Sequence, residues 1–213
     1  MNRLIALLMM AAAATGLAPV PAAAHPHIFV TVSSEVVYGP NGQVAAVKHA
    51  WTFDDMFSAN TVQGIESKQK DVYTREELAP IAEVNVTSLK EYNFFTQLVV
   101  GGQKVEFKDA TDYWLEFKDS TLTLHFTLQP KEAAKGGSFD LEVYDPDYFI
   151  DFGLAEKEPV RLASAPGNCK LEISKPGEVN VANGKRLSEA FFQKPDAANY
   201  GSQFASKITV VCK

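Results

Sequence analysis

The stretch TLTLHFTL at residues 121–128 alternates polar and apolar side chains without a break. Leucine or phenylalanine occupies every second position, and threonine or histidine occupies the positions between. A period of two residues sends alternate side chains to opposite faces of a strand. The stretch therefore predicts a β-strand with one buried and one polar face, which needs a second layer of structure to cover it.

Similar strand patterns recur on both sides of this stretch. Residues 28–38 and 44–53 flank the turn sequence GPNG at 39–42, a combination that indicates a β-hairpin. Further strands are expected at residues 95–100, 104–108, 113–117, 139–144, 160–175, 177–182 and 207–213. The sequence thus predicts a mainly β protein, antiparallel and β-sandwich-like or built from two packed β units.

Residues 54–92 break this pattern and predict a helical insertion. The sequence TREE at 74–77 fits a capping box, in which a threonine hydroxyl and a glutamate carboxylate satisfy backbone N–H groups where a helix begins. Pro80 lies too far inside for a first-turn proline, so we expect it to kink or shorten this helix. A second short helix is expected near Leu187–Phe192.

Residues 1–24 have the order of a cleavable secretory signal peptide. Arg3 precedes an apolar run from Leu4 to Met10, and the sequence AAA at 22–24 offers the small side chains that a signal peptidase accepts. The run is shorter than the about 20 apolar residues of a membrane-spanning helix, and no later stretch is apolar enough to span. We expect a periplasmic protein that begins at His25 after cleavage, with no membrane insertion of the mature chain.

The remaining chain changes character near Pro159. We expect a β-rich domain over residues 25–158 and a C-terminal β unit over 159–213, either separate or part of the same domain. Cys169 and Cys212 are the only cysteines, and two cysteines in an oxidising compartment most often pair. Their disulfide would close a loop of roughly 40 residues and contribute about 3–4 kcal/mol by chain entropy.

The net charge of −6 bears on possible partners. An acidic chain without a basic block is a poor candidate for binding nucleic acid or anionic lipid. The sequence contains no G-x-S-x-G, no H-E-x-x-H and no phosphate-binding glycine loop. We therefore do not expect an enzyme.

The candidate metal ligands begin at the expected mature terminus. The α-amine and the ring of His25 would chelate one ion, and such nitrogens suit Zn, Ni, Co and Cu. Pro26 has no N–H to lose, which excludes a square-planar site built from backbone amides. His27 and His49 are the further candidates, because the predicted hairpin can bring them together. His125 lies on the threonine face of its strand and is expected at the surface.

Two other interpretations of these histidines stay open. The sequence HPH at 25–27 is also typical of a solvated chain end, and His49 of a buried histidine that is satisfied by a hydrogen bond. Asp54, Asp145 and Asp147 are candidates for a fourth ligand or for partners of the histidines. Alternatively, Asp54 or Asp55 caps the helix that follows, and Asp145, which precedes a proline, starts a turn.

Three blocks of sequence resemble one known family. HPHIFV at 25–30, HAWTFDDMFS at 49–58 and YDPDYF at 144–149 are similar to the DUF1007 family of exported bacterial proteins, over nearly the whole mature chain. Its members are often described as periplasmic components of an uncharacterised ABC-type transport system, and they commonly accompany nickel/cobalt or zinc transport. The resemblance implies a role in handling divalent transition metals, without an established activity.

Our leading hypothesis is a periplasmic accessory protein that binds Zn, Ni, Co or Cu and delivers or senses the ion for an inner-membrane metal transporter. The first alternative is a metal-free β-sandwich interaction module that regulates a transporter by contact. The second, ranked last, is a copper enzyme that uses a brace formed by His25.

Overall fold

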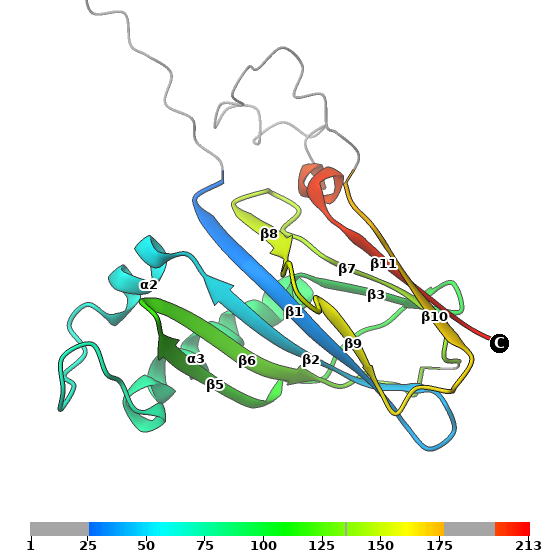
Figure 1. Ribbon diagram of the computed structural model, residues 1–213, viewed down its shortest axis with the longest axis horizontal. Coiled ribbons are helices and arrows are strands. Elements are labelled where there is room, and N and C mark those ends of the chain that lie inside the picture. The colour runs from blue at the N-terminus through cyan, green and yellow to red at the C-terminus, as the bar shows by residue number, and fades with distance from the viewer. Residues whose placement is uncertain (1–25, 135, 177–198) are drawn as a thin grey trace, which may run out of the picture.

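The computed structural model describes residues 26–134, 136–176 and 199–213 (Figure 1). One sheet has six strands, which are β1 (Ile28–Tyr38), β2 (Val44–Phe53), β5 (Thr111–Lys118), β6 (Thr121–Leu128), β8 (Ile150–Leu154) and β9 (Val160–Ala163). The other sheet has five, which are β3 (Thr96–Val100), β4 (Gln103–Lys104), β7 (Phe139–Val143), β10 (Cys169–Ser174) and β11 (Lys207–Cys212). The prediction of a mainly β, sandwich-like fold is confirmed.

The predicted hairpin forms the centre of the six-stranded sheet. β1 pairs antiparallel with β2 from Val30 to Tyr38, and the sheet order is β5-β6-β2-β1-β8, with β9 also on β1. β8 and β9 follow one another along the same edge of β1, and both run parallel to it. Figure 1 shows β8 and β9 beside β1. The sheet is therefore mixed, whereas the sequence predicted antiparallel pairing.

The alternation in β6 produces the expected buried face. Leu122, Leu124 and Leu128 are completely inaccessible to solvent, and Phe126 is 1% exposed. The ring of Trp51 on β2 packs edge-on against Phe126, with 4.9 Å between ring centroids. Each such side chain contributes about 1.5–3 kcal/mol when it is buried, so this face is a main source of stability.

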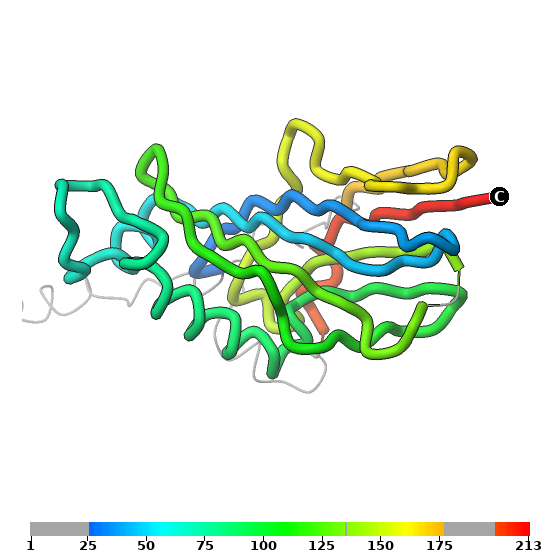
Figure 2. The backbone as a smooth tube through the Cα atoms, turned by 90° about the horizontal axis from the view of Figure 1, so that it is seen from below, coloured from blue at the N-terminus to red at the C-terminus, as the bar shows by residue number. Residues whose placement is uncertain are grey.

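The helical insertion consists of α2 (Asp55–Val62), α3 (Arg75–Leu89) and the 3-10 helix η2 (Lys90–Phe95). The predicted capping box is present at Thr74 and Glu77. Of the two effects expected of Pro80, a kink or a shorter helix, the shortening is wrong, because α3 continues nine residues beyond Pro80. Leu78, Ala82 and Val86 are buried at a spacing of four residues, and α3 packs against β5 (Figure 2). This packing offsets the lost hydrogen bond.

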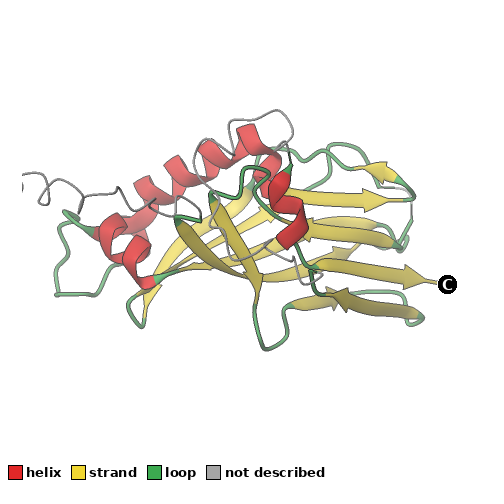
Figure 3. Cartoon of the chain, turned by 90° about the horizontal axis from the view of Figure 1, so that it is seen from above, coloured by secondary structure: helices red, strands yellow, loops and turns green. Residues whose placement is uncertain are grey.

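The helices and sheets occupy different parts of the molecule. Figure 3 shows α2 and α3 along one side of the strands, and a further short helix near the C-terminal end of the chain. In the described ranges, no helix is long and apolar enough to cross a membrane.

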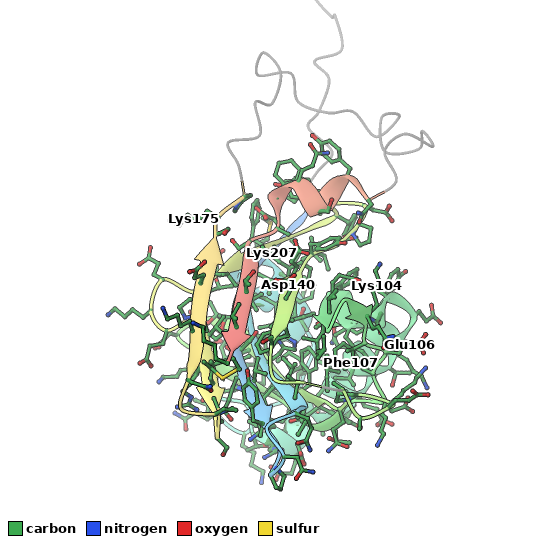
Figure 4. All side chains as sticks on the ribbon, turned by 90° about the vertical axis from the view of Figure 1, so that its right-hand side faces the viewer. Lys104, Glu106, Phe107, Asp140, Lys175 and Lys207 are labelled. Carbon is green, nitrogen blue, oxygen red and sulfur yellow. A yellow bond between two sulfur atoms is a disulfide. The ribbon has the colours of Figure 1, made fainter. Side chains whose placement is uncertain are left out.

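The C-terminal residues contribute to both sheets. β9 pairs with β1 in the larger sheet, whereas β10 and β11 extend the smaller sheet from β7. Cys169 and Cys212 face each other across β10 and β11 and form the predicted disulfide. Lys207 lies 3.0 Å from Asp140 on the neighbouring strand (Figure 4). The strand expected at 177–182 and the helix expected near 187–192 lie outside the described residues.

Candidate functional site

His49 lies in the core between the sheets and is 3% exposed. Its Nδ1 accepts a hydrogen bond from the Ser34 hydroxyl at 3.0 Å, and its Nε2–H donates to the Thr96 hydroxyl oxygen at 3.3 Å. This tautomer follows because the Thr96 hydroxyl itself donates to the Phe94 carbonyl. Burial lowers the pKa of His49 from 6.5 to about 3. The ring is therefore neutral, and both of its nitrogens are occupied.

The strand register separates His49 from His27. Ser34 is the residue of β1 that lies opposite His49. His27 precedes Ser34 by seven residues, and seven residues of extended strand span about 23 Å. The expectation that the hairpin brings the two histidines together is therefore wrong. The hairpin forms, but it pairs His49 with the middle of β1 and turns its side chain toward the core. His49 is therefore a buried histidine satisfied by hydrogen bonds, which was the alternative interpretation of this residue.

His27 lies at the far end of this hairpin, directly before β1, and is exposed. Its ring centroid is 4.6 Å from that of Phe149, and its backbone N–H donates to the Phe149 carbonyl at 2.9 Å. Asp54 reaches the same end of β1, since its Oδ2 accepts from the Phe29 N–H at 3.0 Å. His25 lies outside the described residues.

Asp54 has two structural roles at this end of the sheet. Its Oδ1 accepts from the Phe57 N–H at 2.8 Å and caps α2, while its Oδ2 binds β1 through Phe29. The cap role predicted for this aspartate pair thus falls to Asp54. A carboxylate offers about four lone-pair sites, so both bonds leave acceptor capacity on Asp54.

Asp145 organises the turn before β8. Its carboxylate accepts from the backbone N–H groups of Asp147, Phe149 and Ile150, each at 3.0 Å. Burial raises the pKa of Asp145, and hydrogen bonds from these N–H groups oppose that shift. Asp145 therefore holds a turn, which was the alternative interpretation of this segment. Asp147 is exposed at the tip of the same turn.

The 3-10 helix η5 (Tyr200–Phe204) covers this turn. The Gly201 N–H donates to the Pro146 carbonyl at 2.9 Å. A Cβ atom at Gly201 would lie within 1.8 Å of the Asp145 carbonyl oxygen, so only glycine fits there. The Tyr148 and Phe204 rings stack with centroids 4.0 Å apart. The turn that carries Asp147 is thus held from two sides.

The predicted ligands consequently fall into two groups. His27 directly precedes β1, Asp54 bonds to Phe29 near the start of β1, and Asp147 lies in the turn that leads into the neighbouring β8. His49, by contrast, belongs to the core, and Asp145 to the interior of that turn. In the parts of the chain that the structure describes, no three His, Cys, Asp or Glu side chains are placed to hold a metal ion.

A second feature lies on the outer face of the six-stranded sheet, where a cavity of about 410 Å³ opens. Strand pairing arranges its lining in two adjacent rows that cross the sheet. The first row consists of Trp114, His125, Ala50 and Ser33. The second row consists of Thr127, Lys48, Glu35 and Arg161. Ala50 and Ser33 have short side chains between larger neighbours, which is why the surface is hollow here.

Sequence comparison places the chain in a family. The family described as "Protein of unknown function (DUF1007)" matches residues 10–212. The chain belongs to the DUF1007 family. This DUF1007 protein is also similar to an uncharacterized protein of Haemophilus influenzae, with 22% identity over 195 residues, which cover 89% of the chain and 92% of that relative. The resemblance inferred from the three sequence blocks is confirmed.

Some of the charged side chains that line the cavity of the DUF1007 protein form one ion-pair network, and others stand outside it. Glu35 pairs with Arg161 and, at 3.4 Å, with Lys48. The hydrogen bond from Arg161 holds the pKa of Glu35 below its usual value. Burial lowers the pKa of His125, and the Glu116 carboxylate, 3.6 Å from its Nε2, only partly opposes this. His125 is therefore neutral at pH 7.

His125 is less exposed than the sequence predicted. Its ring stacks on Trp114 with centroids 4.5 Å apart and an interplanar angle of 8°, and 23% of its side chain is exposed. Its position on the threonine face was predicted, but the stack was not. The bulge in β5 that brings Trp114 opposite His125 has no clear signal in the sequence.

Proposed function

We propose that the mature protein is a periplasmic accessory protein that binds one divalent transition metal ion at the start of β1 and delivers it to an inner-membrane transporter, or senses it there. The ion is Zn, Ni, Co or Cu, and it is cargo. His25 and His27 supply the nitrogen ligands, and a carboxylate from Asp54 or Asp147 completes the set.

The observation that carries this proposal is the exposure of His27 directly before β1, at the end of the strand where Asp54 bonds to Phe29. The strand after His27 is anchored by Asp54, which bonds to Phe29, and the ring of His27 rests against Phe149. A ligand on such a support loses little conformational freedom when it binds an ion.

The surroundings of His27 also suit contact with a partner. Phe29 and Phe149 are 52% and 44% exposed, although both are large and apolar. Asp151 lies opposite Phe29 in the parallel pairing of β1 with β8. An apolar surface bordered by aspartates favours a partner with apolar and basic groups, which supports handover of the ion to another protein.

The proposal differs from the sequence-based hypothesis in its ligands. His49 is left out because its nitrogens are bonded to Ser34 and Thr96. Asp145 is left out because three backbone N–H groups occupy its oxygens. The site then depends on His25, and the chelating α-amine of His25 exists only after removal of residues 1–24.

The test is a calorimetric titration of the mature protein, beginning at His25, with each of the four metals. We expect one equivalent to bind with a Kd below about 1 µM. His25→Ala and His27→Ala should each weaken binding at least about tenfold. His49→Gln is the matched control, and it should leave the affinity unchanged.

Two results would contradict the proposal. One is the absence of binding tighter than micromolar for all four metals, and the other is binding that His27→Ala does not alter. If a membrane partner is captured by the protein equally well in the presence of a chelator, the metal-free interaction module becomes the better account.

A further inference from the structure

We propose that the cavity on the outer face of the six-stranded sheet binds a short peptide with a free amino end and a free carboxyl end. The proposal is independent of metal binding, because none of the metal ligands proposed above lines this cavity. It follows from the shape of the floor, the placement of charges and the distance between them.

The floor of the cavity offers hydrogen-bonding groups without bulk. Ser33 and Thr127 bring hydroxyl groups, and Ala50 lies between their strands. Hydroxyls both donate and accept, so they can satisfy the N–H and C=O groups of a peptide laid across the strands. A floor of this kind suits a backbone.

One wall is a rigid aromatic stack. Trp114 is held between the His125 ring on one face and the Arg75 guanidinium on the other, each 4.5 Å from its ring centre. Nε2 of His125 is buried and lies 3.6 Å from the Glu116 carboxylate, so His125 contributes to this wall through its ring. The edges of the Trp114 and His125 rings suit an apolar side chain of the peptide.

The cationic side of the cavity fits the peptide carboxylate. Lys48 and Arg161 share the single negative charge of Glu35, so one positive charge remains in this network. The carboxylate is assigned to Lys48, because its distance to Glu35, 3.4 Å, is long and because a second carboxylate of the lining, Glu158, is three residues before Arg161 in the sequence.

The opposite side fits the peptide amino group. Asp112 is exposed, lies in the bulge of β5 and has a φ of 50°. Its side chain makes no hydrogen bond or ion pair to another described residue. A carboxylate held this way at the rim suits an ammonium group.

The separation of the two ends selects the length of the ligand. Asp112 is on β5 and Lys48 is on β2, with β6 between them. Two strand spacings correspond to about 10 Å. An extended chain covers about 3.3–3.6 Å per residue, so about three residues bridge the ends and a single amino acid does not. A cavity of about 410 Å³ is within the ordinary range for such ligands.

The test uses trialanine and Ala-Phe-Ala as probes, with calorimetry on the mature protein without metal. We expect at least one tripeptide to bind with a Kd between about 10 µM and 1 mM. The N-acetylated and the C-amidated forms should each bind at least about tenfold more weakly, since each lacks one charge. Free alanine should bind more weakly than either tripeptide.

Substitutions then locate the two ends. Lys48→Gln should weaken the free tripeptide but not the C-amidated one, and Asp112→Asn should weaken the free tripeptide but not the N-acetylated one. Asn tolerates left-handed backbone, so the fold should survive. Asp119→Asn is the matched control: Asp119 has a φ of 51° in the same hairpin but does not line the cavity. Failure of both tripeptides to bind, or equal binding of blocked and free forms, would overturn the proposal.

Discussion

The most informative perturbation of the core is His49→Gln. His49 joins the two sheets through Ser34 on β1 and Thr96 on β3. Glutamine is similar in size and can make hydrogen bonds, but it does not titrate. The variant therefore separates the hydrogen bonds of the ring from its protonation. At pH 7.5 we expect it to be less stable by about 1–3 kcal/mol, because the hydroxyl partners lose their optimal geometry.

The pH dependence follows from the lowered pKa of His49. The folded value is about 3, against an ordinary value of 6.5 that applies to the unfolded chain. Between these values the unfolded state binds a proton that the folded state does not, so falling pH favours unfolding. The stabilisation is fully present above pH 6.5 and is lost as the pH falls toward 3. Each pH unit well below 6.5 is worth about 1.4 kcal/mol, which gives a loss of about 2.7 kcal/mol between pH 7.5 and 4.5.

The assay is urea unfolding of the wild-type protein and of His49→Gln at several pH values from 7.5 to 4.5. Other titrating groups contribute equally to both proteins, so the difference between the two unfolding free energies isolates His49. We expect the stability advantage of the wild-type protein to fall by about 2–3 kcal/mol over the range, which cancels most or all of it. A difference that stays constant with pH would refute the reasoning about the buried neutral ring.

Three further predictions concern the parts that frame the two sites. Gly201→Ala should destabilise the fold by about 3 kcal/mol or more, because the added Cβ would collide with the Asp145 carbonyl. The control is Gly153→Ala, which has open space around it and should change the unfolding free energy by less than about 1 kcal/mol. Equal effects of the two substitutions would contradict the close contact at Gly201. Asp54→Ala should cost about 1–2 kcal/mol in urea unfolding through loss of the α2 cap, and no loss would show that the cap is replaceable. Reduction of the disulfide between residues 169 and 212 should lower stability by about 3–4 kcal/mol, and an unchanged unfolding midpoint would contradict this.

Local sequence patterns predicted the elements of this fold well. The two-residue alternation in β6 and the turn sequence between β1 and β2 correspond to strands with nearly the predicted bounds. The capping box at Thr74 marks the start of α3. These features depend on neighbouring residues, so the sequence contains them directly. The end of α3 was not predicted, because burial against β5 offsets the local effect of Pro80.

The arrangement of the sites was less predictable, since it depends on pairing between distant segments. Which residue of β1 lies opposite His49 is decided by the register, and that register placed Ser34 there and left His27 at the end of the strand. The parallel pairing of β9 with β1, which brings Arg161 to Glu35, joins segments more than a hundred residues apart. The strand patterns of these segments contain no information about such partners.

The most direct test of the proposed function is a native mass measurement on protein recovered from the periplasm and incubated with one equivalent of Zn, Ni, Co or Cu. We predict a chain that begins at His25, contains one disulfide and carries one metal ion, and we predict that the ion is lost from His27→Ala and kept by His49→Gln. A protein of this mass that binds none of the four metals, or a His27→Ala variant that keeps the ion, would contradict the account.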